Sequence, residues 1–245
     1  MDAPLHDMHC HLDFLADGRD VALRLGEKGT RLFMNTVTPA EYAGACAKFD
    51  GVEGVRVGLG MHPWWVDGTF DAERFAELAR TTRFIGEVGL DFGKRGSVNR
   101  AEQVQAFAQI ARICAEQGGK VLSMHAVKSV DSALEILQVS GALETCTCIF
   151  HWFTGSSDQL HRALQSGCYV SANRFMLQTK RGPEYVKAIP ASRLLLETDE
   201  PPEDAVGFTA DDLLAPLREV ADAIATIKGA EALATIAATS ERLLG

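Results

Sequence analysis

Two histidines and an aspartate form a His-x-His-x-Asp triplet, His9, His11 and Asp13, at the end of an apolar run near the start of the sequence. Imidazole and carboxylate groups are common ligands of divalent metals. Residues two apart in a strand leave the same face, so the triplet predicts two imidazoles within reach of one cation. Taken alone, a His-x-His pair is as compatible with chance or core packing as with a site.

Four more residues of metal-binding type each close a short β-like segment farther along the sequence: Glu87, His125, His151 and Asp199. Glu87 interrupts an apolar run, where a buried carboxylate generally needs a cationic partner. A carboxylate also suits bridging two cations. A structural ion pair or a hydrogen-bonded core histidine is the alternative for each residue by itself. Their joint occurrence at strand ends favours a shared metal site and hence a metal-dependent hydrolase.

Alternating strand and helix patterns must position these residues. Strands are predicted at 4–9, 31–37, 55–60, 84–89, 120–125, 146–151, 168–173 and 193–198. Helices are predicted at 18–28, 39–48, 71–81, 99–118, 129–140, 156–167, 183–189, 209–225 and 229–243. The alternation favours parallel strands with crossover helices, and eight such units predict a single-domain TIM-type (β/α)₈ barrel over residues 1–245. In that fold catalytic groups gather at the carboxyl ends of the strands.

An open, doubly wound α/β sheet is the alternative architecture. Its dinucleotide-binding loop is not matched, because Gly58-Leu59-Gly60 lacks the third glycine of the fingerprint. Glu197 has the same strand parity as Asp199, and we expect it to play a supporting role deeper in the barrel. His6 and His161 fall outside the pattern and are predicted to lie on the surface.

Composition restricts the class of protein. The chain has 245 residues, 47% of them hydrophobic, and a net charge of −9, which argues against broad electrostatic binding to duplex nucleic acid. A nuclease whose metals hold one phosphate locally is still compatible with that charge. No signal-peptide pattern and no run of ~18 apolar residues is evident, so a cytoplasmic protein without membrane contact is expected. The six cysteines show no C-x-x-C spacing and are predicted to be buried, reduced thiols. Cys10 should face away from the two neighbouring histidines.

Six segments in order resemble the TatD family of metal-dependent deoxyribonucleases, within the amidohydrolase-like barrels. They are His9-Cys10-His11-Leu12-Asp13, Gly60-Met61-His62-Pro63, Gly86-Glu87-Val88-Gly89-Leu90-Asp91, the strand ending at His125, His151-Trp152-Phe153-Thr154-Gly155 and Glu197-Thr198-Asp199-Glu200-Pro201. The resemblance implies two divalent cations and phosphodiester hydrolysis, often exonucleolytic. It implies that His9 and His11 bind one metal, that His125 and His151 bind the other, and that Glu87 bridges them. Asp199 would bind metal or act as the base.

The predicted function is therefore cleavage of DNA, most readily single-stranded DNA, by a water activated between two metals, with Glu87 and Asp199 as catalytic residues. Zinc, manganese and magnesium are the candidate metals, because imidazoles favour the first two and the resemblance allows the third. Asp13 is expected to contact a ligand residue or to cap the following helix. Hydrolysis of a small amide, lactone or phosphoester is one alternative. A non-catalytic partner protein that keeps the metal site for structure is another.

Substrate contacts are predicted for His62, Lys128, Arg174 and Trp152, which follow strand ends. Lys94 and Arg95 are further candidates for holding phosphates, with a solvated surface charge as the alternative. Trp64, Trp65 and Phe175 are candidates for stacking unpaired bases, with loop packing as the alternative. Three departures from the family pattern affect substrate preference. The Arg-Asn-Glu-Pro-like stretch usual after the eighth strand is not recognisable. Val127 occupies a position where relatives commonly have arginine, and Glu200 adds a carboxylate.

Overall fold

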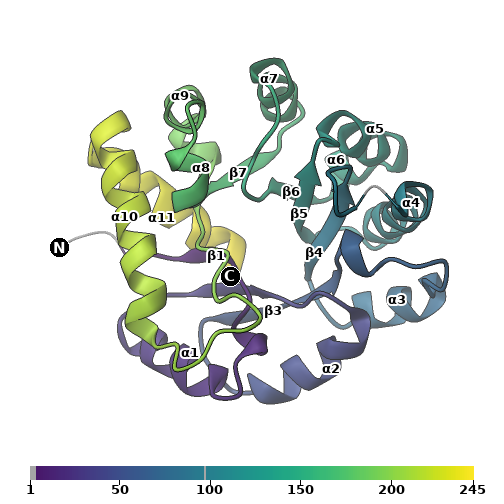
Figure 1. Cartoon of the computed structure of the whole chain (residues 1–245), viewed down its shortest axis with the longest axis horizontal. Helices are drawn as coiled ribbons and strands as arrows, with labels where there is room; N and C mark the ends of the chain where they lie inside the picture. The colour runs from purple at the N-terminus through teal and green to yellow at the C-terminus, as the bar shows by residue number, and fades with distance from the viewer. Residues whose placement is uncertain (1–3, 97) are drawn as a thin grey trace. The chain divides into compact units, whose positions relative to one another are not determined.

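Parallel strands alternate with helices along the chain. The computed structural model describes residues 4–96 and 98–245, and in these ranges the strands follow one another in sequence order from β1 to β8 (Figure 1). They are β1 (Asp7–Cys10), β2 (Leu32–Asn35), β3 (Val55–Met61), β4 (Phe84–Asp91), β5 (Val121–Val127), β6 (Thr147–Phe150), β7 (Tyr169–Ala172) and β8 (Leu194–Leu196). This order matches the predicted (β/α)₈ topology.

Helices follow the strands. They are α1 (Gly18–Glu27), α2 (Pro39–Lys48), α3 (Ala72–Ala79), α4 (Arg100–Gln117), α5 (Val130–Ser140), α6 (Ala142–Thr145), α7 (Ser157–Gln165), α8 (Arg174–Gln178), α9 (Gly182–Ala188), α10 (Ala210–Lys228) and α11 (Glu231–Leu244). Three 3₁₀ turns, η1 (Leu12–Phe14), η2 (Pro63–Trp65) and η3 (Ala191–Arg193), complete the set. The short helices α6 and α8 were not predicted, because four or five residues are too few to show a helical period.

The chain divides into two compact units. Unit 1 consists of Met1–Met34, Ala45–Val57 and Val170–Gly245, and unit 2 of Asn35–Gly44 and Gly58–Tyr169. Each unit is discontinuous in sequence and contains both strands and helices, and each is described separately below. The prediction of one domain over residues 1–245 stays a prediction.

Unit 1 contains β1 and β8, which carry three of the predicted site residues at their ends. β1 pairs in parallel with β2, with Asp7 opposite Leu32, and β7 pairs with β8, with Val170 opposite Leu194. The long helices α10 and α11, drawn in yellow in Figure 1, pack against β8. Their inward side chains, among them Leu217, are fully buried. The helices α10 and α11 cover the apolar side chains of unit 1, and the polar residues His9, His11 and Asp199 lie at the carboxyl ends of β1 and β8.

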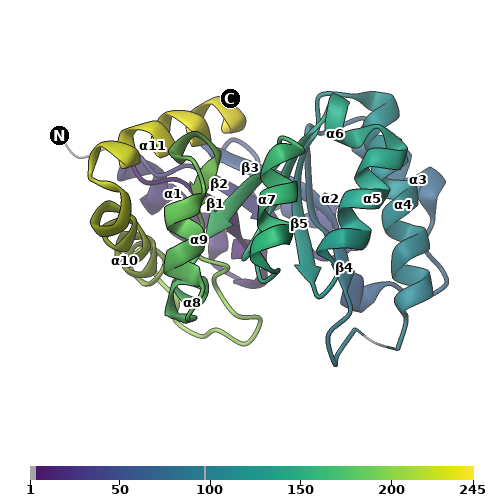
Figure 2. The same cartoon turned by 90° about the horizontal axis from the view of Figure 1, so that it is seen from above.

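Unit 2 is built around β4 and β5, which run side by side in the same direction (Figure 2). Both strands are almost continuously buried, as expected for parallel strands covered by helices. α4 packs on β4 and α5 on β5, burying large side chains such as Phe107. The register places Gly89 opposite His125, so the polar ends of the two strands meet at the same edge.

Two predictions at the start of the chain were wrong. β1 begins at Asp7 rather than at residue 4, and it ends at Cys10, so His11 lies just beyond the strand. His6 is buried, not on the surface, because its Nδ1 accepts a hydrogen bond of 3.1 Å from the backbone N–H of Arg31. Its Nε2 lies 3.4 Å from the carboxylate of Glu241. These partners are distant in sequence, which is why no local pattern predicted them.

The prediction for His161 was confirmed, and the prediction for the cysteines was confirmed for four of the six. His161 is exposed, as predicted. All six cysteines are free, but Cys46 and Cys146 are only half-buried, since each lies toward an element end. Among the described residues, no helix combines the length and the apolar character needed to cross a membrane.

Candidate metal centre

Three predicted ligands come together at the carboxyl ends of β1 and β8 in unit 1. The Nε2 atoms of His9 and His11 lie 3.1 Å apart. Asp199 Oδ1 lies 3.5 Å from the first and 3.4 Å from the second. Both imidazoles are buried. Two ring nitrogens and one carboxylate oxygen therefore lie close together. A divalent cation could bind all three at once. We refer to these residues as the unit 1 group.

Backbone hydrogen bonds between the two strand ends hold the unit 1 group. The N–H of Asp199 donates to the carbonyl of His9 at 2.9 Å, and the N–H of His11 donates to the carbonyl of Glu200 at 2.8 Å. The ring of His11 also stacks on Phe14, with centroids 5.0 Å apart. Asp199 has a φ of 62°, a left-handed conformation that aspartate tolerates better than most residues. The group is therefore positioned by main chain as well as by packing.

Asp7 supports the unit 1 group by accepting hydrogen bonds from the strand ends that carry it. It was not predicted as a site residue. Its Oδ1 accepts hydrogen bonds of 3.1 Å from the backbone N–H groups of His9 and Thr198. Its Oδ2 accepts the hydroxyl of Thr198 at 2.5 Å. Complete burial raises the pKa of Asp7 to about 8, against the effect of these hydrogen bonds. A carboxylate two residues before His9, on the same face of the strand, is the signal that could have identified it.

Replacing Asp7 by alanine is expected to lower the free energy of unfolding by about 3 kcal/mol, because buried donors on His9 and Thr198 lose their acceptor. Asp7→Asn, which keeps an oxygen acceptor, should cost clearly less. Urea unfolding of the metal-free proteins measures both. Loss of this support should also weaken metal binding by about 10- to 100-fold in calorimetry. An Asp7→Ala variant with the unfolding midpoint of the wild type would contradict this supporting role.

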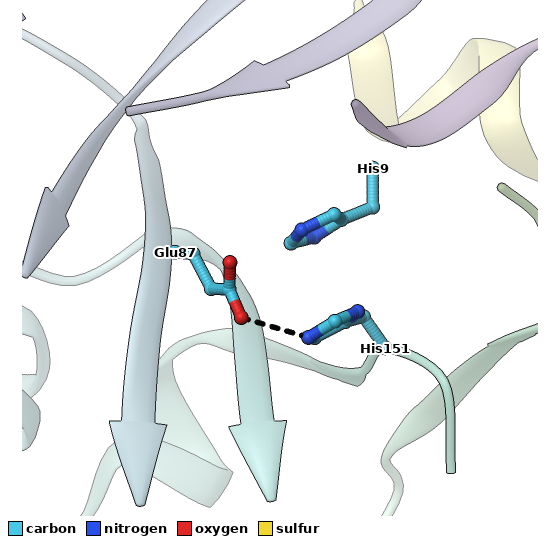
Figure 3. Close-up of side chains that lie close together, drawn as sticks. All are labelled: His9, Glu87 and His151. Carbon is cyan, nitrogen blue, oxygen red and sulfur yellow. Dashed lines mark hydrogen bonds and ion pairs between the residues drawn. The ribbon is translucent and has the colours of Figure 1, made fainter. Parts of the chain in front are cut away.

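Glu87 is the centre of a second group, in unit 2. Its Oε1 lies 2.8 Å from His125 Nδ1, 2.9 Å from His151 Nε2 and 3.3 Å from His62 Nε2. Figure 3 shows the carboxylate of Glu87 directed at the imidazole of His151. Glu87 is 3% exposed. One buried carboxylate oxygen therefore meets three imidazole nitrogens, and we call these residues the Glu87 group.

Asp91 fixes the orientation of His125. The Nε2 of His125 lies 3.2 Å from Asp91 Oδ2. Burial alone would raise the pKa of Asp91, but hydrogen bonds from His125, Trp64 and the Gly93 N–H lower it to about 2. An ionised carboxylate only accepts hydrogen bonds, so Nε2 of His125 donates to Asp91 and this contact fixes the orientation of the ring. Asp91 was not predicted as a site residue, although it ends the same apolar strand as Glu87.

The ring charge of His125 reflects the same contacts. Burial by itself would lower the pKa of His125, but the hydrogen bonds to Asp91 and Glu87 raise it above its usual value. These two contacts thus favour the protonated form of the His125 ring. A divalent cation would satisfy the same carboxylates with fixed positive charge.

The structure distributes the predicted site residues over the two groups. His9, His11 and Asp199 meet in unit 1. Glu87, His125 and His151 contact one another in unit 2. His62, predicted to contact substrate, lies in the Glu87 group. Cys10 faces away and donates to the carbonyl of Phe33, as predicted. Asp13 lies in η1, beyond the strand.

The remaining predicted substrate contacts follow strand ends. Lys128 is exposed after β5 with a φ of 56°, and Trp152 is half-buried beside His151 with a φ of 39°. Arg174 begins α8 and donates from Nη2 to Glu200 Oε1 at 2.7 Å. Positive φ values at non-glycine residues carry strain and gather at functional sites. The roles assigned to these residues stay predictions.

Both groups fit a divalent metal. Each combines imidazole nitrogens with a carboxylate oxygen. The ligand atoms of the unit 1 group lie within 4.8 Å of one another, and so do those of His62, Glu87 and His125. His151 adds an Nε2 at 2.9 Å from the same Glu87 oxygen. Imidazole-rich sets favour zinc, manganese or iron over magnesium. A (β/α)₈ fold with histidine and carboxylate groups at its strand ends defines a class of protein, the metal-dependent (β/α)₈ hydrolases.

The comparison with protein families gives the particular family. The family described as TatD related DNase matches residues 6–244, so the chain belongs to it. A 3′-5′ ssDNA/RNA exonuclease TatD from Dickeya dadantii is 29% identical over 175 residues, which are 69% of this chain and 65% of that protein. The protein of the same name from Klebsiella pneumoniae is 33% identical over 149 residues, 55% of this chain and 53% of its own. The matched region thus spans about half to two thirds of these relatives.

Solved structures confirm the predicted (β/α)₈ fold class. YjjV, a TatD homolog from Escherichia coli, superposes with a TM-score of 0.82 at 19% identity over 100% of this chain and 98% of its own. A hydrolase of the TatD family from Entamoeba histolytica gives 0.81 at 15% identity over 99% and 98%. At these identities the likeness concerns the fold.

Proposed function

We propose that this protein is a metal-dependent phosphodiester hydrolase that removes nucleotides from the 3′ end of single-stranded DNA. The unit 1 group and the Glu87 group would each supply ligands for one of two divalent cations. The observation that carries the proposal is the buried Oε1 of Glu87, with three imidazole nitrogens within 3.3 Å. The family description and the names of the bacterial relatives support phosphodiester bonds in single-stranded nucleic acid as the substrate.

When bound, the cations would lower the pKa of a water and neutralise charge on the phosphate. The residues of the chain have separate tasks around them. His9 and His11 would hold one cation, while His125 and His151 would hold the other. Asp199, with its Oδ1 beside both imidazoles of the unit 1 group, would accept the proton of the attacking water. Glu87 bridging two cations remains a prediction in this scheme.

Binding of substrate phosphates requires positive charge. The chain is acidic overall, so that charge has to come from single side chains near the strand ends, such as Lys128 and Arg174. Arg174 is engaged by Glu200, whose pKa is raised by burial and lowered in part by that guanidinium. Because the guanidinium already donates to Glu200, the pair is a weaker phosphate site than a free arginine would be. Lys128 is exposed and available to a phosphate. We propose that Lys128 and Arg174 contact the strand and that Trp152 packs on it.

The test strips the protein with a chelator and adds zinc, manganese or magnesium back with an end-labelled single-stranded oligonucleotide. At least one metal should restore stepwise shortening from the 3′ end, and His125→Ala should abolish it. If no metal restores cleavage and His125→Ala matches the wild type, the nuclease proposal fails. Turnover of small amides or esters without cleavage of DNA would favour the amidohydrolase-like alternative. Stoichiometric metal without any turnover would favour the non-catalytic one.

The proposed location is the cytoplasm. The six free cysteines support it, because thiols stay reduced in that compartment. Their oxidation state in protein purified under nitrogen is the measurement, and native disulfides would contradict the location.

A further inference from the structure

Trp64 and Arg95 form an exposed pair next to the Glu87 group in unit 2. Trp64 lies in η2, directly after β3, and 37% of it is exposed. The guanidinium carbon of Arg95 lies 3.8 Å from the centroid of the indole ring. Arg95 is itself exposed and makes no ion pair within residues 4–96 and 98–245. An aromatic ring with a cation stacked on it is thus presented to solvent.

The indole ring is held at its edge, while the guanidinium of Arg95 lies over its face. Trp64 Nε1 donates to Asp91 Oδ2 at 2.6 Å, and the backbone N–H of Trp64 donates to His62 Nδ1 at 3.1 Å. The indole ring also meets the imidazole of His62 edge-on, with centroids 4.7 Å apart. The same Asp91 oxygen holds His125. The ring is therefore held in a constant position relative to the Glu87 group.

We propose that Trp64 is the stacking site for the unpaired base of the nucleotide being removed, and that Arg95 binds the neighbouring phosphate. The inference rests on the proposed function and names the part of the substrate that this site recognises. Stacking of a base on an aromatic side chain tolerates any sequence, because every base has a π-face. Arginine suits the second task because its weakly hydrated, planar guanidinium moves readily from a ring to a phosphate. The base would take the place that the guanidinium now occupies over the ring.

The neighbouring tryptophan provides a matched control. Trp65 is 47% exposed, more than Trp64. Its side chain makes no hydrogen bond and no ring contact with the part of the chain that the structure describes. If any exposed aromatic in this turn bound DNA, the two residues would matter equally. The proposal requires that they differ.

The first experiment measures binding alone, with metal-free protein and fluorescence anisotropy. The probes are a labelled single-stranded oligonucleotide and the same strand with an abasic 3′-terminal residue. Trp64→Ala should weaken binding of the complete strand by about tenfold, which corresponds to ~1.4 kcal/mol. It should bind the abasic strand as the wild type does. Trp65→Ala should match the wild type with both. Trp64→Phe, which keeps a ring, should retain most of the preference for the complete strand.

The second experiment measures turnover by the metal-loaded enzyme. Trp64→Ala should raise KM for the complete strand more than for the abasic strand. Arg95→Gln should weaken binding of both strands by a similar factor and reduce the salt dependence of binding. Equal binding of both strands by the wild type would overturn the stacking site, as would equal losses in Trp64→Ala and Trp65→Ala. Failure of the wild type to cleave any oligonucleotide would contradict the proposed function instead, so the two failures are distinguishable.

Discussion

Replacing Glu87 by glutamine is expected to lower turnover of single-stranded DNA by about 10³-fold, while the protein still folds. Glutamine has nearly the same volume and keeps one oxygen for the imidazoles of His125 and His151. It removes the negative charge that would hold a cation, and the loss of a metal that stabilises the transition state costs several kcal/mol. About 4 kcal/mol corresponds to that factor.

Turnover and metal content should be measured on the same preparations, by single-strand cleavage and by elemental analysis. Glu116→Gln is a matched control, because Glu116 is an exposed residue of α4 in the same unit, paired with Arg112. The control should keep wild-type turnover and metal content. A Glu87→Gln enzyme that retained both would show that the carboxylate is a structural partner of the histidines and not a metal ligand.

Much of this site was predictable because its residues are polar or charged in segments that are otherwise apolar. A histidine or carboxylate at the end of an apolar strand has a desolvation cost, so each such residue stands out in the sequence. Parallel strands then bring these ends to the same edge, which is how His9 and Asp199, 190 positions apart in the numbering, were predicted to meet. The structure brings them together through the hydrogen bond between Asp199 N–H and the His9 carbonyl.

The supporting contacts were not predictable in the same way. Asp7 and Asp91 act through backbone amides and a ring nitrogen whose positions depend on strand pairing and on the η2 turn. His62 was placed at the end of a strand, but its approach to Glu87 follows from the path of the chain after Met61. Such contacts depend on distances of a few tenths of an ångström, and the periodicity of a sequence does not contain them.

Replacing Asp199 by asparagine is expected to lower kcat by about 10²- to 10⁴-fold with little change in stability. The amide cannot accept the proton of the attacking water, and general base catalysis contributes a factor of that size. Asparagine tolerates the left-handed backbone that Asp199 adopts, with its φ of 62°. Asp199→Ala should lose similar activity and should also lower the free energy of unfolding by about 1 kcal/mol, because alanine tolerates that conformation less well.

Cleavage assays and thermal unfolding separate the chemical effect from the conformational one. Asp204→Asn, an exposed change in the same loop after β8, should alter neither. Full activity in Asp199→Asn would remove this residue as the base. In that case the lone pairs of His9 and His11 would still converge 3.1 Å apart, and the unit 1 group would be a binding site that leaves proton transfer to another residue. Equal stability of the alanine and asparagine variants would contradict the expected conformational effect. It would show that the left-handed backbone at residue 199 does not lower the free energy of unfolding when alanine occupies it.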